Sequence, residues 1–209
     1  MRHLTSSFLA GAIILAGSAG TAGAAVIAFI DEDIEIPTTY EGVSLNLETG
    51  EFGMAAAGLA GADLNFIWGG RGVTNDADQT VATPTWQPVR SGTGNTDPIE
   101  ALGIGTEVGP SSVTSTGFGG SANHFASFAS GTRQFLGYTL VLEDSTVAYG
   151  WAEVTLRDDN LPGVIHRWAY EDTGAPIAVA EIPEPSQACL AALGLLVPIL
   201  RRSRPSRLV

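Results

Sequence analysis

The central part of the chain, residues 25–182, places hydrophobic side chains at every second position in several short runs. A two-residue period is typical of β-strands that bury one face, whereas a helix would repeat every 3.6 residues. The clearest runs are 135–142 and 147–156, which a short polar segment separates. This arrangement predicts two antiparallel strands joined as a hairpin. Further strands are predicted at residues 26–30, 43–47, 63–68 and 164–170.

The alternation also assigns side chains to the two faces of the predicted hairpin. Tyr138 shares a face with the leucines of the first strand, and Trp151 shares the other face with its apolar neighbours in the second strand. The small residues Gly137 and Gly150 leave room for an aromatic ring from a neighbouring strand to lie over the backbone. Trp151 is therefore predicted to lie in the core.

Residues 69–132 are rich in Gly, Ser, Thr, Asn and Pro, a composition typical of turns. A structureless loop of this length is uncommon in a compact domain, so the hydrophobic residues within it predict additional short strands. The one helix candidate, 54–59, is interrupted by glycine. The pattern predicts an all-β protein: a single antiparallel β-sandwich or jelly-roll-like domain at 25–182, flanked by an N-terminal signal peptide and a C-terminal hydrophobic helix.

Residues 1–24 have the three-part layout of a secretory signal peptide. A positive charge at Arg2 precedes an apolar stretch, and Ala22 and Ala24 supply small side chains at the −3 and −1 positions of a cleavage site. The alternative, a membrane anchor, would need about 20 apolar residues, which is longer than this stretch. We therefore expect signal peptidase to cleave after Ala24 and the chain to be exported.

Residues 183–209 form a second distinct segment at the C-terminus. A short spacer, Pro183-Glu184-Pro185, precedes a hydrophobic run at 188–200. Basic residues then end the chain: Arg201, Arg202, Arg204 and Arg207. As a helix, the hydrophobic run would be roughly 20 Å long against a hydrocarbon core of about 30 Å, so it suits a transient span better than a permanent anchor. The arginines would stay on the cytoplasmic side.

This C-terminal segment resembles the PEP-CTERM sorting signal of exported bacterial proteins, in which Pro-Glu-Pro, a hydrophobic helix and an arginine cluster follow in that order. The resemblance implies recognition by an exosortase, a membrane protease-transpeptidase, in a Gram-negative-type bacterium that makes extracellular polysaccharide. The order of residues at 149–151, 168–171 and 176–177 also resembles the C-terminal half of many PEP-CTERM surface proteins. That second resemblance implies an all-β extracellular domain and carries no catalytic residues.

Composition narrows the possible functions. All ten basic residues are arginine, which excludes chemistry that depends on a lysine side chain, and the single cysteine, Cys189, excludes an intramolecular disulfide. The whole chain has a formal net charge of −12. Five of the ten arginines lie in the two terminal segments, so residues 25–182 hold 21 acidic residues against five arginines, a net charge of −16. Such a surface argues against nucleic-acid binding and repels anionic polymers at low salt.

Candidate chemistry in the central region is sparse. Acidic clusters in predicted loops suit either solvated turns or a structural Ca²⁺, which prefers oxygen ligands. The candidate calcium ligands are Asp31, Asp33, Asp76, Asp78, Asp158 and Asp159. The two histidines, His124 and His166, suit a loop and a strand face respectively, and the chain has no Gly-x-Ser-x-Gly nucleophile motif. No catalytic residue is assigned, and no other cofactor is expected.

The sequence predicts an exported cell-surface or extracellular-matrix-associated protein with a structural or interaction role rather than an enzyme. Four tryptophans, at positions 68, 86, 151 and 168, support one alternative, a carbohydrate-binding module or calcium-dependent polysaccharide binder. A glycoside-active enzyme is a second alternative, since an acidic chain always offers paired carboxylates. The expected partners are the exosortase-type enzyme, signal peptidase, the membrane in transit, and extracellular polysaccharide.

Overall fold

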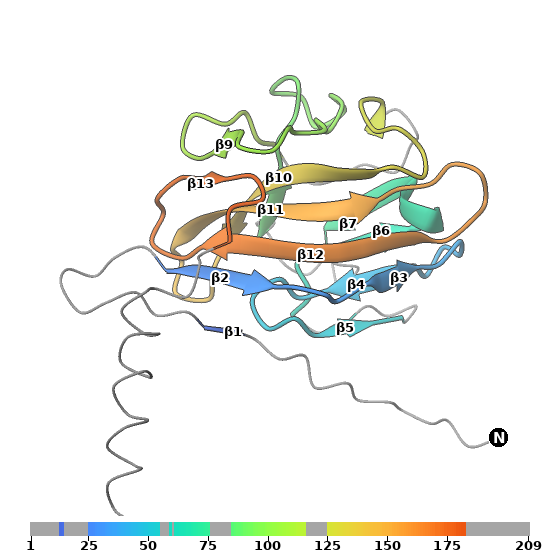
Figure 1. Cartoon of the computed structure of the whole chain (residues 1–209), viewed down its shortest axis with the longest axis horizontal. Helices are drawn as coiled ribbons and strands as arrows, with labels where there is room; N and C mark the ends of the chain where they lie inside the picture. Colours follow the sequence, from blue (N-terminus) through green and yellow to red (C-terminus); the bar gives the residue numbers. More distant parts are fainter. Residues whose placement is uncertain are drawn as a thin grey trace, which may run out of the picture.

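The computed structural model describes residues 13–14, 25–54, 59, 61–75, 85–115 and 125–182. Over these residues the protein is all-β, as predicted, and its strands pair in antiparallel sheets (Figure 1). The strands are β1 (Ile13–Ile14), β2 (Val26–Phe29), β3 (Ile34–Ile36), β4 (Val43–Leu45), β5 (Phe52–Gly53), β6 (Leu64–Ile67), β7 (Gly72–Asn75), β8 (Trp86–Pro88), β9 (Glu107–Val108), β10 (Arg133–Val141), β11 (Val147–Thr155), β12 (Gly163–Glu171) and β13 (Ile177–Ala178). A short 3₁₀ turn, η1 (Trp68–Gly70), separates β6 from β7.

The largest sheet is built around three nine-residue strands. Its order is β1-β2-β12-β11-β10-β8, and β3 continues the edge beyond β2 by pairing with the start of β12. The predicted hairpin is confirmed as β10 and β11, which pair without interruption from Arg133 opposite Thr155 to Val141 opposite Val147. Between β11 and β12 the register shifts at Glu153 and Val154, which marks a β-bulge.

Gly150 confirms the expected close approach of an aromatic ring. A Cβ at this position would lie 2.5 Å from Cε2 and 2.6 Å from Oη of Tyr138, which is the residue opposite it on β10. At Gly137 the neighbours are instead the aliphatic side chains of Leu102 and Val108. The ring of Tyr138 is fully buried, and its hydroxyl donates to the carbonyl oxygen of Ala169 at 3.2 Å.

A second sheet, of order β5-β4-β6-β7, packs against one face of the large sheet through a shared hydrophobic core. From the large sheet the core takes Phe29, Tyr138 and Trp168, and from the second sheet it takes Leu45 and Phe66. The rings of Phe29 and Trp168 stack with their centroids 4.7 Å apart. The side chains of β10 that enter this core recur at every second position, as Leu136, Tyr138 and Leu140 do, which explains the two-residue period there.

The opposite face of the large sheet is partly covered by β9, β13 and the segments beside them. Here Trp151, predicted to lie in the core, is fully buried, and Phe135 meets it edge to face with the ring centroids 5.7 Å apart. Val108 from β9 and Ile177 from β13 complete this smaller core. The glycine-rich middle of the chain thus contributes short strands and bridges, as expected.

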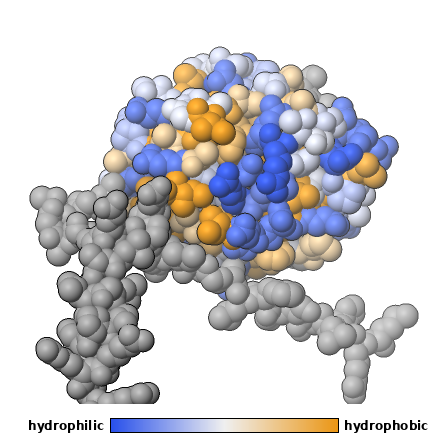
Figure 2. Space-filling view, viewed as in Figure 1, coloured by the Kyte–Doolittle hydropathy of each residue, from blue (hydrophilic) through white to orange (hydrophobic). Residues whose placement is uncertain are grey.

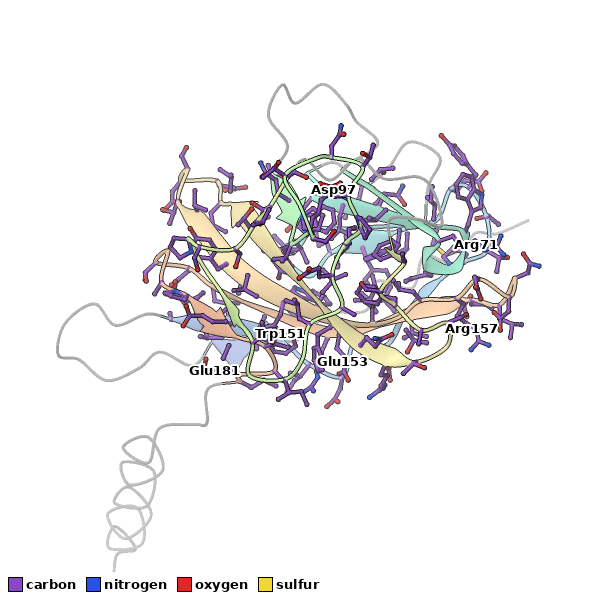
Figure 3. All side chains as sticks on the ribbon, turned by 90° about the horizontal axis from the view of Figure 1, so that it is seen from above. Arg71, Asp97, Trp151, Glu153, Arg157 and Glu181 are labelled. Carbon is purple, nitrogen blue, oxygen red and sulfur yellow. The ribbon has the colours of Figure 1, made fainter. Side chains whose placement is uncertain are left out.

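The two ends of the long strands differ in what they carry. At one end, the amide of Asp172 donates to the carbonyl of Ala25, and Ile182 packs into the smaller core beside Val26. The other end carries η1 and the loop between β11 and β12 (Figure 1). Since β12 has nine residues, these ends are separated by about 26 Å along the strand. Figure 3 likewise places Arg71 and Arg157 at one end of the domain and Glu181 at the other.

Apart from Ile13 and Ile14, which form β1, the two terminal segments fall outside the described residues, and with them the predictions made for their ends. These are the cleavage-site alanines Ala22 and Ala24 and the tail at 183–209. Most of the helix candidate at 54–59 also lies outside them. Within the described part of the chain, no helix is long and apolar enough to cross a membrane.

Candidate functional site

Three of the four tryptophans are fully buried, whereas Trp68 leaves 38% of its surface exposed. It lies beside Tyr40, which is 71% exposed, with the two ring centroids 5.6 Å apart and the rings tilted by 50°. On the face displayed in Figure 2, hydrophobic patches lie between hydrophilic ones. Among the described residues, Tyr40 and Trp68 are the one pair of contacting aromatic rings in which both side chains are exposed, and we call them the aromatic platform.

The backbone that presents Trp68 is in an unusual conformation. Trp68, Gly69 and Gly70 have positive φ angles of 52°, 70° and 96° in succession. Glycine adopts this left-handed region freely, whereas a residue with a Cβ adopts it at a cost of about 1–2 kcal/mol. Strained non-glycine residues persist only where the surrounding structure holds them, and they are concentrated at functional sites.

Main-chain hydrogen bonds hold this segment from both sides. The amides of Trp68 and Gly69 donate to the carbonyls of Thr39 and Pro37 at 3.0 and 2.8 Å. The amide of Arg157 donates to the carbonyl of Gly69 at 3.0 Å. A Cβ on Gly69 would lie 2.6 Å from the carbonyl oxygen of Leu161, so the β11–β12 loop packs directly on the turn. The aromatic platform is therefore attached to a fixed backbone, which lowers the entropic cost of binding a ligand.

A small pocket of about 70 Å³ adjoins this turn. Its polar lining comes from Arg71, Ser130, Arg157 and Asp158, and its apolar lining from Phe125, Phe128 and Leu156. An Nη of Arg71 donates to the main-chain carbonyl oxygen of Asp158, and the amide of Asp158 donates to Ser130 Oγ at 3.1 Å. Arg71 thereby connects the turn that carries Trp68 to the loop that follows β11.

Beside the pocket, Arg157 and Asp159 form a two-point ion pair. Nε lies 2.9 Å from Oδ1, and the terminal guanidinium nitrogen lies 2.6 Å from Oδ2. The hydrogen bonds from Arg157 are the main reason why the pKa of Asp159 is lowered to about 2. Both groups are well solvated, so this pair orders the loop rather than contributing much to global stability.

A second polar cluster lies at the same end of the large sheet. His166 Nδ1 is 2.5 Å from Asp33 Oδ1, and Nε2 is 2.8 Å from Thr155 Oγ1. A guanidinium nitrogen of Arg133, which can only donate, also lies 2.8 Å from Nδ1, so a donor and an acceptor meet at the same ring nitrogen. Arg133 lies opposite Thr155 on β10, and its guanidinium approaches Asp33 to 3.6 Å. The cluster fastens the loop between β2 and β3 to the large sheet, since it joins residues 133 positions apart in the chain.

The predicted calcium ligands are placed in different surroundings. The Asp33 carboxylate bonds to His166, and the Asp159 carboxylate bonds to Arg157. Asp31, like Asp33, has a positive φ angle. Asp76 and Asp78 lie outside the described residues, as does His124. Among the described residues, no three acidic or histidine side chains come together in a group that could hold a metal ion.

No known protein family, curated protein or solved structure matches the chain. The candidate site therefore rests on the chain's own residues. Sequence reasoning included Trp68 among four equivalent tryptophans and did not single out Tyr40. The available signal was the Trp-Gly-Gly run at 68–70, because two glycines after a strand permit a left-handed turn that directs the preceding side chain outward.

Proposed function

We propose that the chain is an exported bacterial surface protein whose central domain, an antiparallel β-sandwich, binds extracellular polysaccharide through the aromatic platform. The observation that carries this proposal is the exposure of the contacting rings of Tyr40 and Trp68, with Trp68 held on a fixed, left-handed turn. Sugar rings have apolar faces that stack on aromatic rings, and a tilted pair 5.6 Å apart offers two surfaces to adjacent sugar units. The role is binding without catalysis.

Delivery to the surface is the second part of the proposal. Signal peptidase cleaves after Ala24, and an exosortase-type enzyme acts near Pro183–Pro185 after the hydrophobic run has held the protein in the inner membrane. The positions of the domain ends support an anchor on the tail. Ala25 bonds to Asp172 just after β12, at the end of the strand opposite η1, and Figure 3 places Glu181 away from Arg71 of the platform end, so an anchor on the tail would leave the platform pointing away from the membrane.

Glycan binding is tested by titrating the exported protein with purified bacterial extracellular polysaccharides while following tryptophan fluorescence. The emission of Trp68 should shift, because it is the one tryptophan of the four with a substantially exposed ring. Trp68→Ala and Tyr40→Ala should each weaken binding by at least tenfold. Phe52→Ala is the matched control, since Phe52 is another exposed aromatic residue, 43% exposed, on β5. Equal losses in all three variants would contradict the assignment to the platform.

The sorting proposal is tested separately by measuring the intact mass of the protein recovered from the cell surface or the medium. The expected mass corresponds to a chain that begins at Ala25 and lacks Arg201 to Val209. A species that still carries the C-terminal arginines would refute processing of the tail. A species that still carries residues 1–24 would refute signal cleavage.

A further inference from the structure

The arginines of this acidic domain are unevenly distributed. Residues 25–182 hold only five, and two of them, Arg71 and Arg157, line the pocket beside the aromatic platform. Arg167 is bound to Glu153 at 2.6 Å, and Arg90 is buried. The domain has a net charge of −16, yet two of its arginines, Arg71 and Arg157, line one pocket at the platform end.

Arg71 differs from Arg157 in what balances its charge. The guanidinium of Arg157 is neutralised by Asp159 through two hydrogen bonds. The hydrogen bond of Arg71 is made to a main-chain carbonyl, and within the described part of the chain it forms no ion pair with a carboxylate. Guanidinium groups bind carboxylates strongly because two parallel N–H donors match the two carboxylate oxygens. Arg71 therefore has capacity for an anionic ligand.

The pocket is small but large enough for a charged group. Its volume of about 70 Å³ exceeds the roughly 10–15 Å³ that one water molecule needs, so it has room for a carboxylate group. Trp68 belongs to the turn whose Gly70 and Arg71 line the pocket, and its carbonyl accepts from the amide of Arg71 at 3.3 Å. Ser130 accepts from the amide of Asp158, which leaves its hydroxyl proton able to donate to a second carboxylate oxygen.

We infer that the polysaccharide is acidic: a uronic-acid ring stacks on Trp68 while its carboxylate enters the pocket and pairs with Arg71. This inference rests on the proposed function and adds the chemical class of the sugar. One group opposes it, the exposed carboxylate of Asp158, which lines the same pocket and repels an anion. Arg71 and Asp158 therefore provide two opposite tests. Removing the charge of Arg71 should weaken binding of an acidic sugar, and removing the charge of Asp158 should strengthen it.

The experiment compares two matched probes by calorimetry on the exported protein at about 0.15 M salt. One probe is hexagalacturonate, and the other is the same oligosaccharide after its carboxyl groups have been reduced to alcohols. Wild type should bind the acidic probe at least tenfold more tightly, the value of one charge-assisted hydrogen-bonded pair. Arg71→Gln should abolish that preference, and Asp158→Asn should strengthen binding of the acidic probe about two- to fivefold. Arg133→Gln, an exposed arginine outside the pocket, is the control and should change neither affinity.

The outcomes separate this inference from the function on which it rests. Equal binding of both probes by wild type overturns the acidic specificity and leaves glycan binding in place. Equal weakening of both probes by Arg71→Gln also overturns it, because Arg71 would then act only by positioning Trp68. Loss of the preference in Arg133→Gln would show that the anion binds outside the pocket, which would overturn its assignment to Arg71. Failure of wild type to bind either probe, or any native extracellular polysaccharide, overturns the proposed function itself.

Discussion

Replacing Gly150 with alanine tests a close contact in the main core. The new Cβ would lie 2.5 Å from Cε2 and 2.6 Å from Oη of Tyr138, well inside van der Waals contact. The ring cannot move aside easily, because Tyr138 is fully buried and its hydroxyl is bonded to the carbonyl of Ala169. The clash therefore has to be relieved by displacing either the ring or the β10–β11 ladder.

The expected cost follows from these two contacts. Overpacking a core typically costs about 1–3 kcal/mol. A displaced Tyr138 ring would also lose the bond to the carbonyl of Ala169 and leave its own buried hydroxyl without an acceptor, which costs about 1–3 kcal/mol more. We expect Gly150→Ala to lower the free energy of unfolding by about 2–5 kcal/mol, a large part of the 5–15 kcal/mol that is typical of a domain.

Urea denaturation followed by circular dichroism measures this loss. Gly103→Ala is the matched control, because a Cβ there would have only Thr106 Oγ1 as a neighbour, at 3.7 Å. It should change the free energy of unfolding by less than about 1 kcal/mol. Adding Tyr138→Leu to Gly150→Ala should recover part of the loss, since the shorter side chain vacates the space that the Cβ needs. Equal midpoints for Gly150→Ala and Gly103→Ala would refute the packing described for Tyr138.

Three further predictions follow from the ordered polar and aromatic groups. The pKa of Asp159 is about 2, below its usual 3.8, so the Arg157 pair is complete above about pH 4 and is lost as the pH falls towards 2. A carboxyl ¹³C titration should show this value, and Arg157→Gln should return it towards 3.8. Trp168→Phe removes the bond from Nε1 to the buried carbonyl of Leu47 at 3.0 Å and should cost about 2–4 kcal/mol by urea denaturation, against less than about 1 kcal/mol for Trp68→Phe. Excess EDTA should leave the thermal midpoint unchanged, because two of the predicted calcium ligands already bond to an arginine and a histidine; a fall of several degrees would show a structural divalent ion.

The long strands could be predicted because each is nine residues long and buries a face. Over that length the two-residue period is unambiguous, and it also placed Tyr138 and Trp151 on opposite faces. Strands β9 and β13 have only two residues each, which is too short for a period to be recognised. Their existence depends on pairing between Val108 and Ile177, which are distant in the sequence and have no local signal that joins them.

The aromatic platform could not be predicted from the hydrophobic pattern, for a related reason. The hydrophobic pattern extends the strand at 63–68 through Trp68, and a strand tryptophan is usually a core residue. The side chain is exposed because the backbone turns left-handed at Trp68, and that turn is held by contacts with Pro37, Arg157 and Leu161. These contacts come from residues about 30 and 90 positions away in the chain. The local alternation of polar and apolar residues therefore cannot indicate the left-handed backbone of Trp68.

The charge of the domain illustrates how composition and folding act at different distances. At low salt, the net charge of −16 repels an anionic polymer over a long distance. Salt at about 0.15 M screens this repulsion beyond roughly 8 Å. At contact, the relevant charges are those of Arg71 and Asp158, which the fold brings to one pocket from segments 87 positions apart. An acidic glycan would therefore be repelled in dilute buffer yet bound at moderate salt. Association should become faster as salt is first added, the opposite of the decrease expected for a protein whose whole surface attracts its ligand.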